Sequence, residues 1–198
     1  MTDRPPQLPD AHSALLIVDV QNDFLPGGSL AVPDGDAVIG PLNHAIAAFR
    51  ARGRPVIATR DWHPPDHCSF TDQGGPWPPH CVQHSAGARF AAALALPDDA
   101  LVVSKAERPD QDAYSGFQGT DLAGRLRALG VTKLVVGGLA TDYCVLNTVR
   151  DALEAGFEVY VLEDAIRAVD VEPGDGARAV ETMRAAGARF IRSDELAA

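Results

Sequence analysis

The sequence predicts a single α/β domain with three layers, in which a largely parallel sheet lies between helices on both faces. Short apolar runs rich in β-branched residues recur along the chain, and helical patterns separate several of them. Strands that alternate with helices are joined by right-handed crossovers, which place helices on both faces. The 198 residues suffice for one core, so we expect one domain over residues 1-198, with 1-12 flexible.

Six of the apolar runs have the composition of buried strands. Each is short and apolar on both faces, as expected for strands covered by helices on two sides. In chain order the expected strands are 14–18, 55–59, 100–103, 133–136, 158–162 and 189–191.

Four segments between or beside these strands have helical character. The first places apolar residues at spacings of three to four, with Pro41 in its first turn. Thr120 or Asp121 opens the second, and Thr141 or Asp142 opens the third. Gly130 and Gly156 close them. The expected helices are 38–49, 120–130, 141–156 and 174–187.

Overall composition excludes several classes of partner. A net charge of −10 argues against nucleic acid, because binding to phosphates depends on clustered Lys and Arg. No apolar run approaches the roughly 20 residues that span a bilayer, so we expect no membrane partner. The polar, proline-rich start lacks the pattern of a signal peptide. These features favour a cytoplasmic protein.

Three residues at predicted strand ends could form a catalytic site. Asp19 follows the first strand, Lys105 follows the third, and Cys144 comes just after the fourth at the start of a helix. A nearby cation and a helix N-terminus both lower the pKa of a thiol and favour its nucleophilic form. Taken singly, each residue also has a structural interpretation: a turn-capping carboxylate, a solvated surface lysine and a buried core thiol.

In the catalytic interpretation, Asp19 accepts the thiol proton and later donates it to a leaving amine. A pocket closed by Phe24, Trp77 and Tyr114 would raise the pKa of this carboxyl by desolvation. Backbone N–H groups of Ala140 and Cys144 could form an oxyanion hole, because the small residues before them allow close approach. The same glycines are also compatible with a plain strand-to-helix turn.

Potential metal ligands are concentrated in the segment 61–84. It holds four of the six histidines together with three aspartates and two of the three cysteines. A closed structural zinc site would use Cys68 and Cys81 with histidines. A catalytic site would use Asp61 with two histidines and keep open positions. A site without metal remains a third interpretation. With an odd number of cysteines, a disulfide framework is a poor explanation.

Five short motifs in order make the chain resemble bacterial nicotinamidases, within the isochorismatase-like cysteine hydrolases. The motifs are DVQNDF, TRDWHPPDHCSF, GGPWPPHCVQ, the segment from Lys105 through DAYSGF, and GGLATDYCV. The resemblance extends over roughly residues 15–162. It implies a six-stranded, isochorismatase-like (Rossmann-like) sheet. It also implies hydrolysis of nicotinamide, and usually of pyrazinamide, to the acid and ammonia.

The resemblance also assigns roles to individual residues. Asp19, Lys105 and Cys144 match the family's catalytic triad. Asp61, His63 and His80 match the ligands of one divalent metal ion, which is zinc, iron or manganese in the family. His67 matches a histidine that binds metal in only some members, and we place it beside the ligands.

Within the substrate pocket, Phe24, Trp77 and Tyr114 resemble the family's aromatic walls. The resemblance implies a cis peptide between Leu139, which we place at the pocket, and the oxyanion-hole residue Ala140. One departure is His84-Ser85, where the family commonly has Gly-Thr, so the loop shape there is not determined.

Two other functions remain as alternatives. The first is a sibling hydrolase acting on another small amide or on isochorismate, although such relatives generally lack the Asp-x-His and downstream His ligands. The second is a non-catalytic binding domain built on a closed zinc site, in which Cys81 would matter as much as His80. Relatives form dimers and tetramers, so a homo-oligomer is compatible with the resemblance, but no interface is specified.

Overall fold

A computed structural model describes residues 8–197 of the chain. Six parallel strands form one sheet in the order β3-β2-β1-β4-β5-β6. This confirms the predicted fold class. The strands are β1 (Ser13–Val18), β2 (Val56–Asp61), β3 (Leu101–Lys105), β4 (Lys133–Leu139), β5 (Glu158–Arg167) and β6 (Arg189–Ile191).

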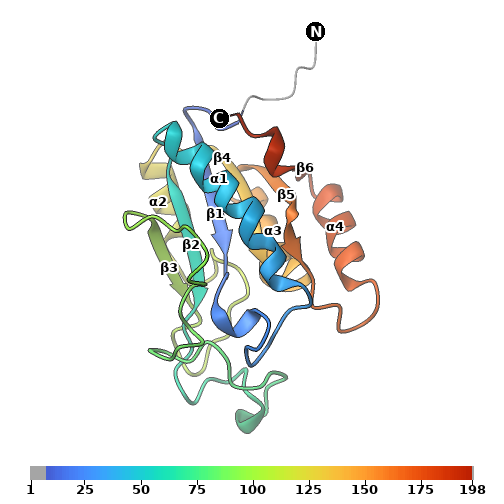
Figure 1. Cartoon of the computed structure of the whole chain (residues 1–198). Coiled ribbons are helices and arrows are strands. Elements are labelled where there is room, and N and C mark those ends of the chain that lie inside the picture. Colours follow the sequence, from blue (N-terminus) through green and yellow to red (C-terminus); the bar gives the residue numbers. More distant parts are fainter. Residues whose placement is uncertain (1–7, 198) are drawn as a thin grey trace.

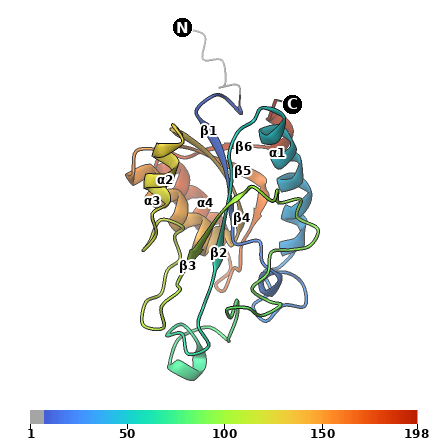
Figure 2. The same cartoon turned by 90° about the vertical axis from the view of Figure 1, so that its left-hand side faces the viewer.

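Helices cover both faces of this sheet, as Figure 2 shows. One face packs against α1, and the other against α2, α3 and α4. The helices are α1 (Ile39–Ala51), α2 (Leu122–Ala128), α3 (Leu146–Glu154) and α4 (Asp175–Ala185). Pro41 lies in the first turn of α1, as predicted, where a missing backbone N–H costs nothing. No helix in the described part of the chain is long and apolar enough to cross a membrane.

Four strands extend further than their apolar runs predicted, and one of them is β4, which continues past residue 136 to Leu139. β2 continues through Arg60 to Asp61, and β3 continues to Lys105. Asp61 pairs with Lys105 in the parallel register, so backbone pairing carries polar residues into the sheet where hydrophobicity gives no signal. β5 runs on to Arg167, with an irregular register opposite β4 between Val136 and Gly138.

The strand order reverses between β1 and β4. The chain places β2 and β3 on one side of β1, then crosses to β4 on the other. In open parallel sheets, ligands bind outside the carboxyl ends of the strands at such a reversal. The two strands approach closely at Gly138, where a Cβ would lie 2.1 Å from the Val18 carbonyl oxygen, so only glycine fits.

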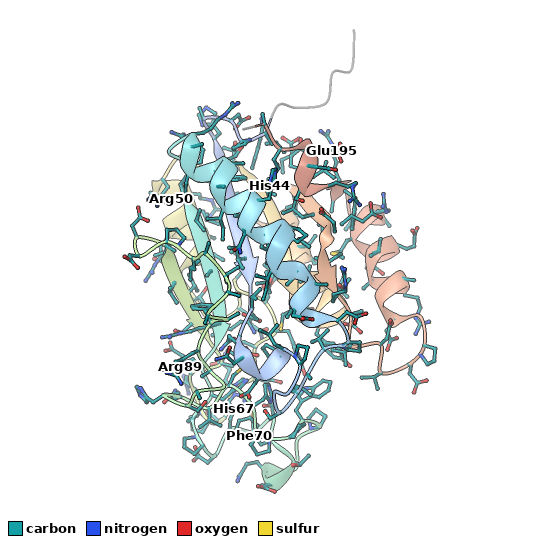
Figure 3. The ribbon with its side chains drawn as sticks, in the orientation of Figure 1. His44, Arg50, His67, Phe70, Arg89 and Glu195 are labelled. Carbon is teal, nitrogen blue, oxygen red and sulfur yellow. The ribbon has the colours of Figure 1, made fainter. Side chains whose placement is uncertain are left out.

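A long loop follows β2 and projects past the carboxyl ends of the strands (Figure 1). Figure 3 places His67 and Phe70 in this loop, at the same end of the molecule. The predicted metal segment therefore lies at the edge of the sheet where the strand order directs a ligand.

The flexible start predicted for residues 1–12 lies mostly outside the described residues. Its described part is packed, since Leu8 is buried and its carbonyl oxygen accepts a hydrogen bond from the backbone N–H of Ala197. Asp10 pairs with Lys133 at the start of β4 and accepts a hydrogen bond from Ser13. Burial raises the pKa of Asp10, but Lys133 and Ser13 outweigh it and lower the pKa from 3.8 to about 2.

This pair gives a prediction about stability. Because the pKa of Asp10 is lower in the folded chain, its stabilisation is present above pH 3.8 and is lost as the pH falls toward 2. Both side chains remain partly in solvent, so we expect Asp10→Asn to lower the free energy of unfolding at pH 7 by about 1 kcal/mol or less. Urea unfolding of the two proteins at several pH values should show this difference shrinking below pH 4. A difference that grows on acidification would contradict the assignment.

Candidate active site

Asp19, Lys105 and Cys144 meet in the interior at the carboxyl ends of β1, β3 and β4. Their exposed fractions are 0%, 1% and 6%. The Lys105 Nζ lies 3.0 Å from Asp19 Oδ2 and 3.5 Å from the Cys144 Sγ. The alternative of a solvated surface lysine is therefore wrong. The structure brings the three predicted catalytic residues into one contact group.

Burial sets the protonation of this group. Burial raises the pKa of Asp19, and the opposing charge of Lys105 only partly offsets it. Burial lowers the pKa of Lys105, but Asp19 and Asp61 outweigh it and raise the pKa well above its usual range. Burial also raises the pKa of the Cys144 thiol, despite Lys105. The expected lowering of the thiol pKa is therefore wrong for the free protein. The proton has to leave Cys144 as the thiol attacks.

Thr59 fixes the orientation of the Asp19 carboxylate. Its Oγ1 is fully buried in β2 and donates a hydrogen bond to Asp19 Oδ1 at 2.7 Å. The other carboxylate oxygen faces the Lys105 Nζ as an ion pair. This hydrogen bond lowers the pKa of Asp19 and opposes the effect of burial. Sequence reasoning missed Thr59, because a threonine inside a strand run is ordinarily a packing residue.

We expect Thr59→Val to shift the acidic limb of the pH profile of kcat/KM to higher pH. Removing a donor to the carboxylate raises the pKa of the base, so Asp19 is protonated and inactive over a wider range. Hydrogen bonds to charged groups are worth about 1.5–3 kcal/mol, which corresponds to a shift of the acidic limb by roughly one to two pH units. Thr59→Ser keeps the hydroxyl and should restore the profile. An unchanged acidic limb in Thr59→Val would contradict this role.

Three predicted metal ligands form a second cluster beside the first. One ligand atom each from Asp61, His63 and His80 lies within 4.8 Å of the other two. Asp61 is the last residue of β2, and a backbone bridge between His63 and Val82 brings the two arms of the loop together. Lys105 forms an ion pair with Asp61 as well as with Asp19. The two clusters therefore share one lysine.

The chemistry of this cluster suits a divalent cation. His63 is 2% exposed, and neither of its ring nitrogens has a hydrogen-bond partner. The Nδ1 of His80 contacts the Pro78 carbonyl oxygen at 2.8 Å, which leaves Nε2 directed to the cluster. Burial lowers the pKa of His80 and favours the neutral ring that binds metals. An orphaned buried imidazole beside a carboxylate is the arrangement that a metal ion satisfies.

His67 lies beside these ligands but has other partners. Its Nδ1 contacts Ser69 Oγ at 2.7 Å and its Nε2 contacts the Gln111 carbonyl oxygen at 3.2 Å. Its ring lies against that of His63, with 4.2 Å between centroids. Because both nitrogens are engaged within the protein, we keep His67 outside the ligand set, in the neighbouring position that the sequence predicted.

The closed zinc interpretation finds no support between residues 8 and 197. Neither group of clustered ligand atoms includes Cys68 or Cys81. Burial raises the pKa of Cys81 far above its usual range, which makes it a poor metal ligand. His84, where the sequence departs from the family pattern, is exposed and packs edge-on against Trp62.

Cys144 lies in a π-helical turn, Thr141–Val145, that connects β4 to α3. The Leu139–Ala140 peptide is cis, as predicted. The helix-capping role expected for Thr141 or Asp142 is wrong. The Asp142 carboxylate instead accepts hydrogen bonds from the backbone N–H groups of Val169 and Asp170, at 2.9 and 2.8 Å. Asp142 thereby ties the nucleophile's turn to the segment after β5.

A pocket connects the thiol with the metal cluster. The predicted residues Phe24, Trp77 and Tyr114 line it, and Trp77 Nε1 donates a hydrogen bond to Tyr114 Oη at 3.0 Å. Leu139 does not line it: its side chain is fully buried in the core beside α1, because strand alternation directs it away from the pocket. The other lining residues are Leu30, Val32, Asp61, His63, Ser69, His80, Asp112, Ala113, Ala140, Tyr143, Cys144 and Val169.

Two aromatic residues near the pocket were missed by sequence reasoning. Tyr143 lines the pocket and packs edge-on against Trp77, with 5.1 Å between ring centroids. Phe70 is 1% exposed and contacts the rings of His63 and His80 edge-on. Both lie inside the quoted motifs, next to residues that carry clearer chemistry.

Residues 13–195 match the Isochorismatase domain family. The chain belongs to the isochorismatase family. It is 44% identical to a nicotinamidase of Escherichia coli, over 88% of this chain and 92% of the relative.

Two solved structures are also similar to this member of the isochorismatase family. A pyrazinamidase of Pyrococcus horikoshii in complex with zinc has a TM-score of 0.88 and 50% identity, covering 91% of this chain and 99% of that one. A protein of L. infantum in complex with nicotinate has a TM-score of 0.88 and 39% identity, covering 95% and 96%.

Proposed function

We propose that this protein is a metal-dependent cysteine amidohydrolase that converts nicotinamide to nicotinate and ammonia, as a step of NAD salvage, and that also accepts pyrazinamide. The observation that carries the proposal is that one pocket is lined by the Cys144 thiol and by Asp61, His63 and His80. The relatives named above support the substrate, since they are a nicotinamidase, a zinc-bound pyrazinamidase and a nicotinate complex.

In this proposal Asp61, His63 and His80 hold one divalent ion. The lone pair of a pyridine nitrogen suits such an ion, which supplies an electrophilic anchor for the ring when bound. Phe24 and Trp77, which line the pocket, contact the flat ring and exclude water. The choice among zinc, iron and manganese stays a prediction, because this ligand set suits several divalent ions.

The first half of the reaction forms a thioester. The Cys144 Sγ attacks the carboxamide carbon while its proton passes to Asp19, which lies within 4.8 Å of the sulfur. The Lys105 ammonium, 3.5 Å from the sulfur, stabilises the negative charge as it develops. The backbone N–H groups of Ala140 and Cys144 hold the carbonyl oxygen as it becomes an oxyanion. The C–N bond then breaks, and Asp19 returns the proton to the departing ammonia.

The second half hydrolyses the thioester. Asp19 is a carboxylate again and accepts a proton from water as the water oxygen attacks the thioester carbon. The C–S bond breaks, nicotinate forms, and the sulfur regains a proton through Asp19. The raised pKa of Asp19 suits this alternation, because a carboxyl that titrates closer to neutrality exchanges protons in both directions.

An ammonia-release assay with the metal-loaded protein tests the proposal. Nicotinamide should be hydrolysed to nicotinate, and pyrazinamide should also be a substrate. Benzamide, which has the same shape but lacks the ring nitrogen, should react with kcat/KM lower by about 100-fold, because it loses an anchor worth about 3 kcal/mol. Turnover of isochorismate without ammonia release from nicotinamide would reject the proposal in favour of the sibling hydrolase.

The cytoplasmic location, the absence of nucleic-acid and membrane partners, the single domain and the homo-oligomer stay predictions. The small-molecule partner is the part of the partner prediction that the pocket and the relatives support.

A further inference from the structure

We infer that Gln21 and Asp23 are positioning residues for the metal site. Gln21 fixes the backbone of Asp61, and Asp23 fixes the peptide between His80 and Cys81. This inference rests on the proposed metal site and extends it to residues that do not line the pocket. Both lie in the short segment that follows β1 and begins with the base Asp19.

Gln21 replaces a missing strand at the end of β2. β1 pairs with β2 as far as Ala58, and the Thr59 carbonyl oxygen still accepts a hydrogen bond from the Asp19 N–H. Beyond that point the chain turns away from the sheet at Asp19, which has a left-handed backbone with φ of 50°. The backbone groups of Asp61 on the β1 side would then lack strand partners. A buried polar group without a partner is costly, so something must satisfy them.

The side chain of Gln21 fills this position with both of its polar atoms. Its Oε1 accepts a hydrogen bond from the Asp61 N–H at 2.8 Å, and its Nε2 donates to the Asp61 carbonyl oxygen at 2.8 Å. The Nε2 also donates to the Ala88 carbonyl oxygen at 2.9 Å. Gln21 is fully buried, so no water competes for these bonds. The amide therefore fixes the peptide groups on both sides of the Asp61 Cα and limits where its carboxylate can point.

Asp23 acts in the same way beside His80, in the loop that follows β2. Its Oδ2 accepts a hydrogen bond from the Cys81 N–H at 2.7 Å, and this N–H belongs to the peptide that follows His80. Cys81 has a φ of 45°, which non-glycine residues rarely adopt without a fixed partner. The other carboxylate oxygen of Asp23, Oδ1, accepts a hydrogen bond from the Ser29 N–H at 3.3 Å.

The space around Asp23 is shaped to hold its carboxylate at this position. A Cβ on Gly87 would lie 2.0 Å from Asp23 Oδ2, so only glycine leaves room for the carboxylate. The Asp23 N–H in turn donates to the Gly87 carbonyl oxygen at 3.1 Å. Asp23 thus holds three segments together, and the His80 arm is one of them.

The topology explains why the two metal ligands need fixed backbone partners. Asp61 is the last residue of β2, whereas His80 lies in the irregular loop between β2 and β3, where a backbone bridge between His63 and Val82 joins the two arms. A metal ion needs its ligands within about 0.2 Å of defined distances, and loops alone vary by more than that. A single segment that binds the backbone at both ligands sets their separation before the ion arrives. Partners of this kind typically change metal affinity by 10–100-fold when they are removed.

The test is the zinc dissociation constant of the apoprotein, measured by competition with a chromophoric chelator. We expect Gln21→Ala and Asp23→Ala each to raise this constant by 10–100-fold. Gln21→Glu keeps the acceptor for the Asp61 N–H and loses the donor, so it should fall between wild type and Gln21→Ala. Raising free zinc above the new dissociation constant should recover nicotinamide turnover in the variants, which a general folding defect would not allow.

Asn43 provides a matched control in α1. Its Nδ2 donates to the Ala93 carbonyl oxygen at 2.9 Å, and its Oδ1 accepts from the Ala95 N–H at 2.7 Å, so it fixes a loop with the same two kinds of bond. Asn43→Ala should lower the thermal midpoint but leave zinc affinity within twofold of wild type.

The outcomes separate this inference from the proposed function. A wild-type protein that binds no zinc would refute the proposed metal site itself. A wild-type protein that binds zinc, with Gln21→Ala and Asp23→Ala within twofold of it, would refute only the positioning roles. If either alanine variant fails to fold as judged by circular dichroism, Gln21→Glu and Asp23→Asn decide the question by the same twofold criterion.

Discussion

Replacing Cys144 with alanine is expected to lower kcat for ammonia release from nicotinamide by roughly 10⁴-fold or more. The Cys144 thiol lines the pocket and contacts Lys105, and without it no thioester can form. The side chain is small and 6% exposed, so the fold should be retained. Ammonia release under saturating nicotinamide, with circular dichroism and zinc content measured on the same samples, checks this result.

Cys68→Ala is the matched control for this variant. Cys68 is a free, partly exposed thiol in the loop after β2, and its side chain is not part of the pocket lining. We expect it to keep activity within about twofold of the parent, as surface substitutions usually do. Appreciable ammonia release by Cys144→Ala would mean that the mechanism does not proceed through this cysteine.

The second large effect is expected when the metal site loses one ligand. His80→Ala leaves two protein ligands, so we expect zinc to be lost at micromolar concentrations and kcat/KM for nicotinamide to fall by more than about 100-fold. His80 is preferable to Asp61 for this test, because Asp61 also forms an ion pair with Lys105 and its removal would change the charge around the base. Metal content and kinetics on one preparation give the result.

Chelation provides the same test without a mutation. Dialysis of the parent against a strong chelator should abolish turnover, and one equivalent of zinc per chain should restore it. For the His80→Ala variant, the matched control is His84→Ala. His84 is an exposed histidine of the same loop, and it packs against Trp62 rather than against the metal ligands. Full activity in a chelated protein shown to be metal-free would rule out the metal's role in the proposed reaction.

The fold class and the catalytic group were accessible from local sequence patterns. Buried parallel strands need continuous β-branched runs, and these runs placed all six strands in the correct order along the chain. Residues that follow such strands lie at one edge of the sheet, so the sequence alone groups Asp19, Lys105 and Cys144. Their type and position carry this information, because only a few side chains can act as base, cation and nucleophile.

The sequence did not predict the protonation state of the catalytic residues. The type and place of Cys144 suggested a lowered thiol pKa, whereas complete burial of the group raises it. Desolvation depends on every atom that surrounds a side chain, and those atoms come from segments far apart in the chain. The same limit applies to Thr59, whose hydroxyl faces Asp19 only because β1 and β2 pair in one particular register.

Side-chain direction at irregular positions was likewise decided by tertiary structure. The sequence-based expectation puts Leu139 in the pocket, but its side chain is buried in the core beside α1. Asp142 was expected to cap a helix and instead binds the segment after β5. Local patterns identify which residue types are present, but they do not specify which distant backbone groups will need them as partners.

The sequence by itself therefore determined the strands, the helices, the residues of the catalytic group and the three metal ligands as candidates. The tertiary structure alone decided that one lysine pairs with both aspartates, that His67 has other partners, and that Gln21 and Asp23 bind the backbone beside two ligands. The physical reason is that identity and periodicity are local properties of the chain. Hydrogen-bond satisfaction and desolvation instead depend on contacts between segments that only folding brings together.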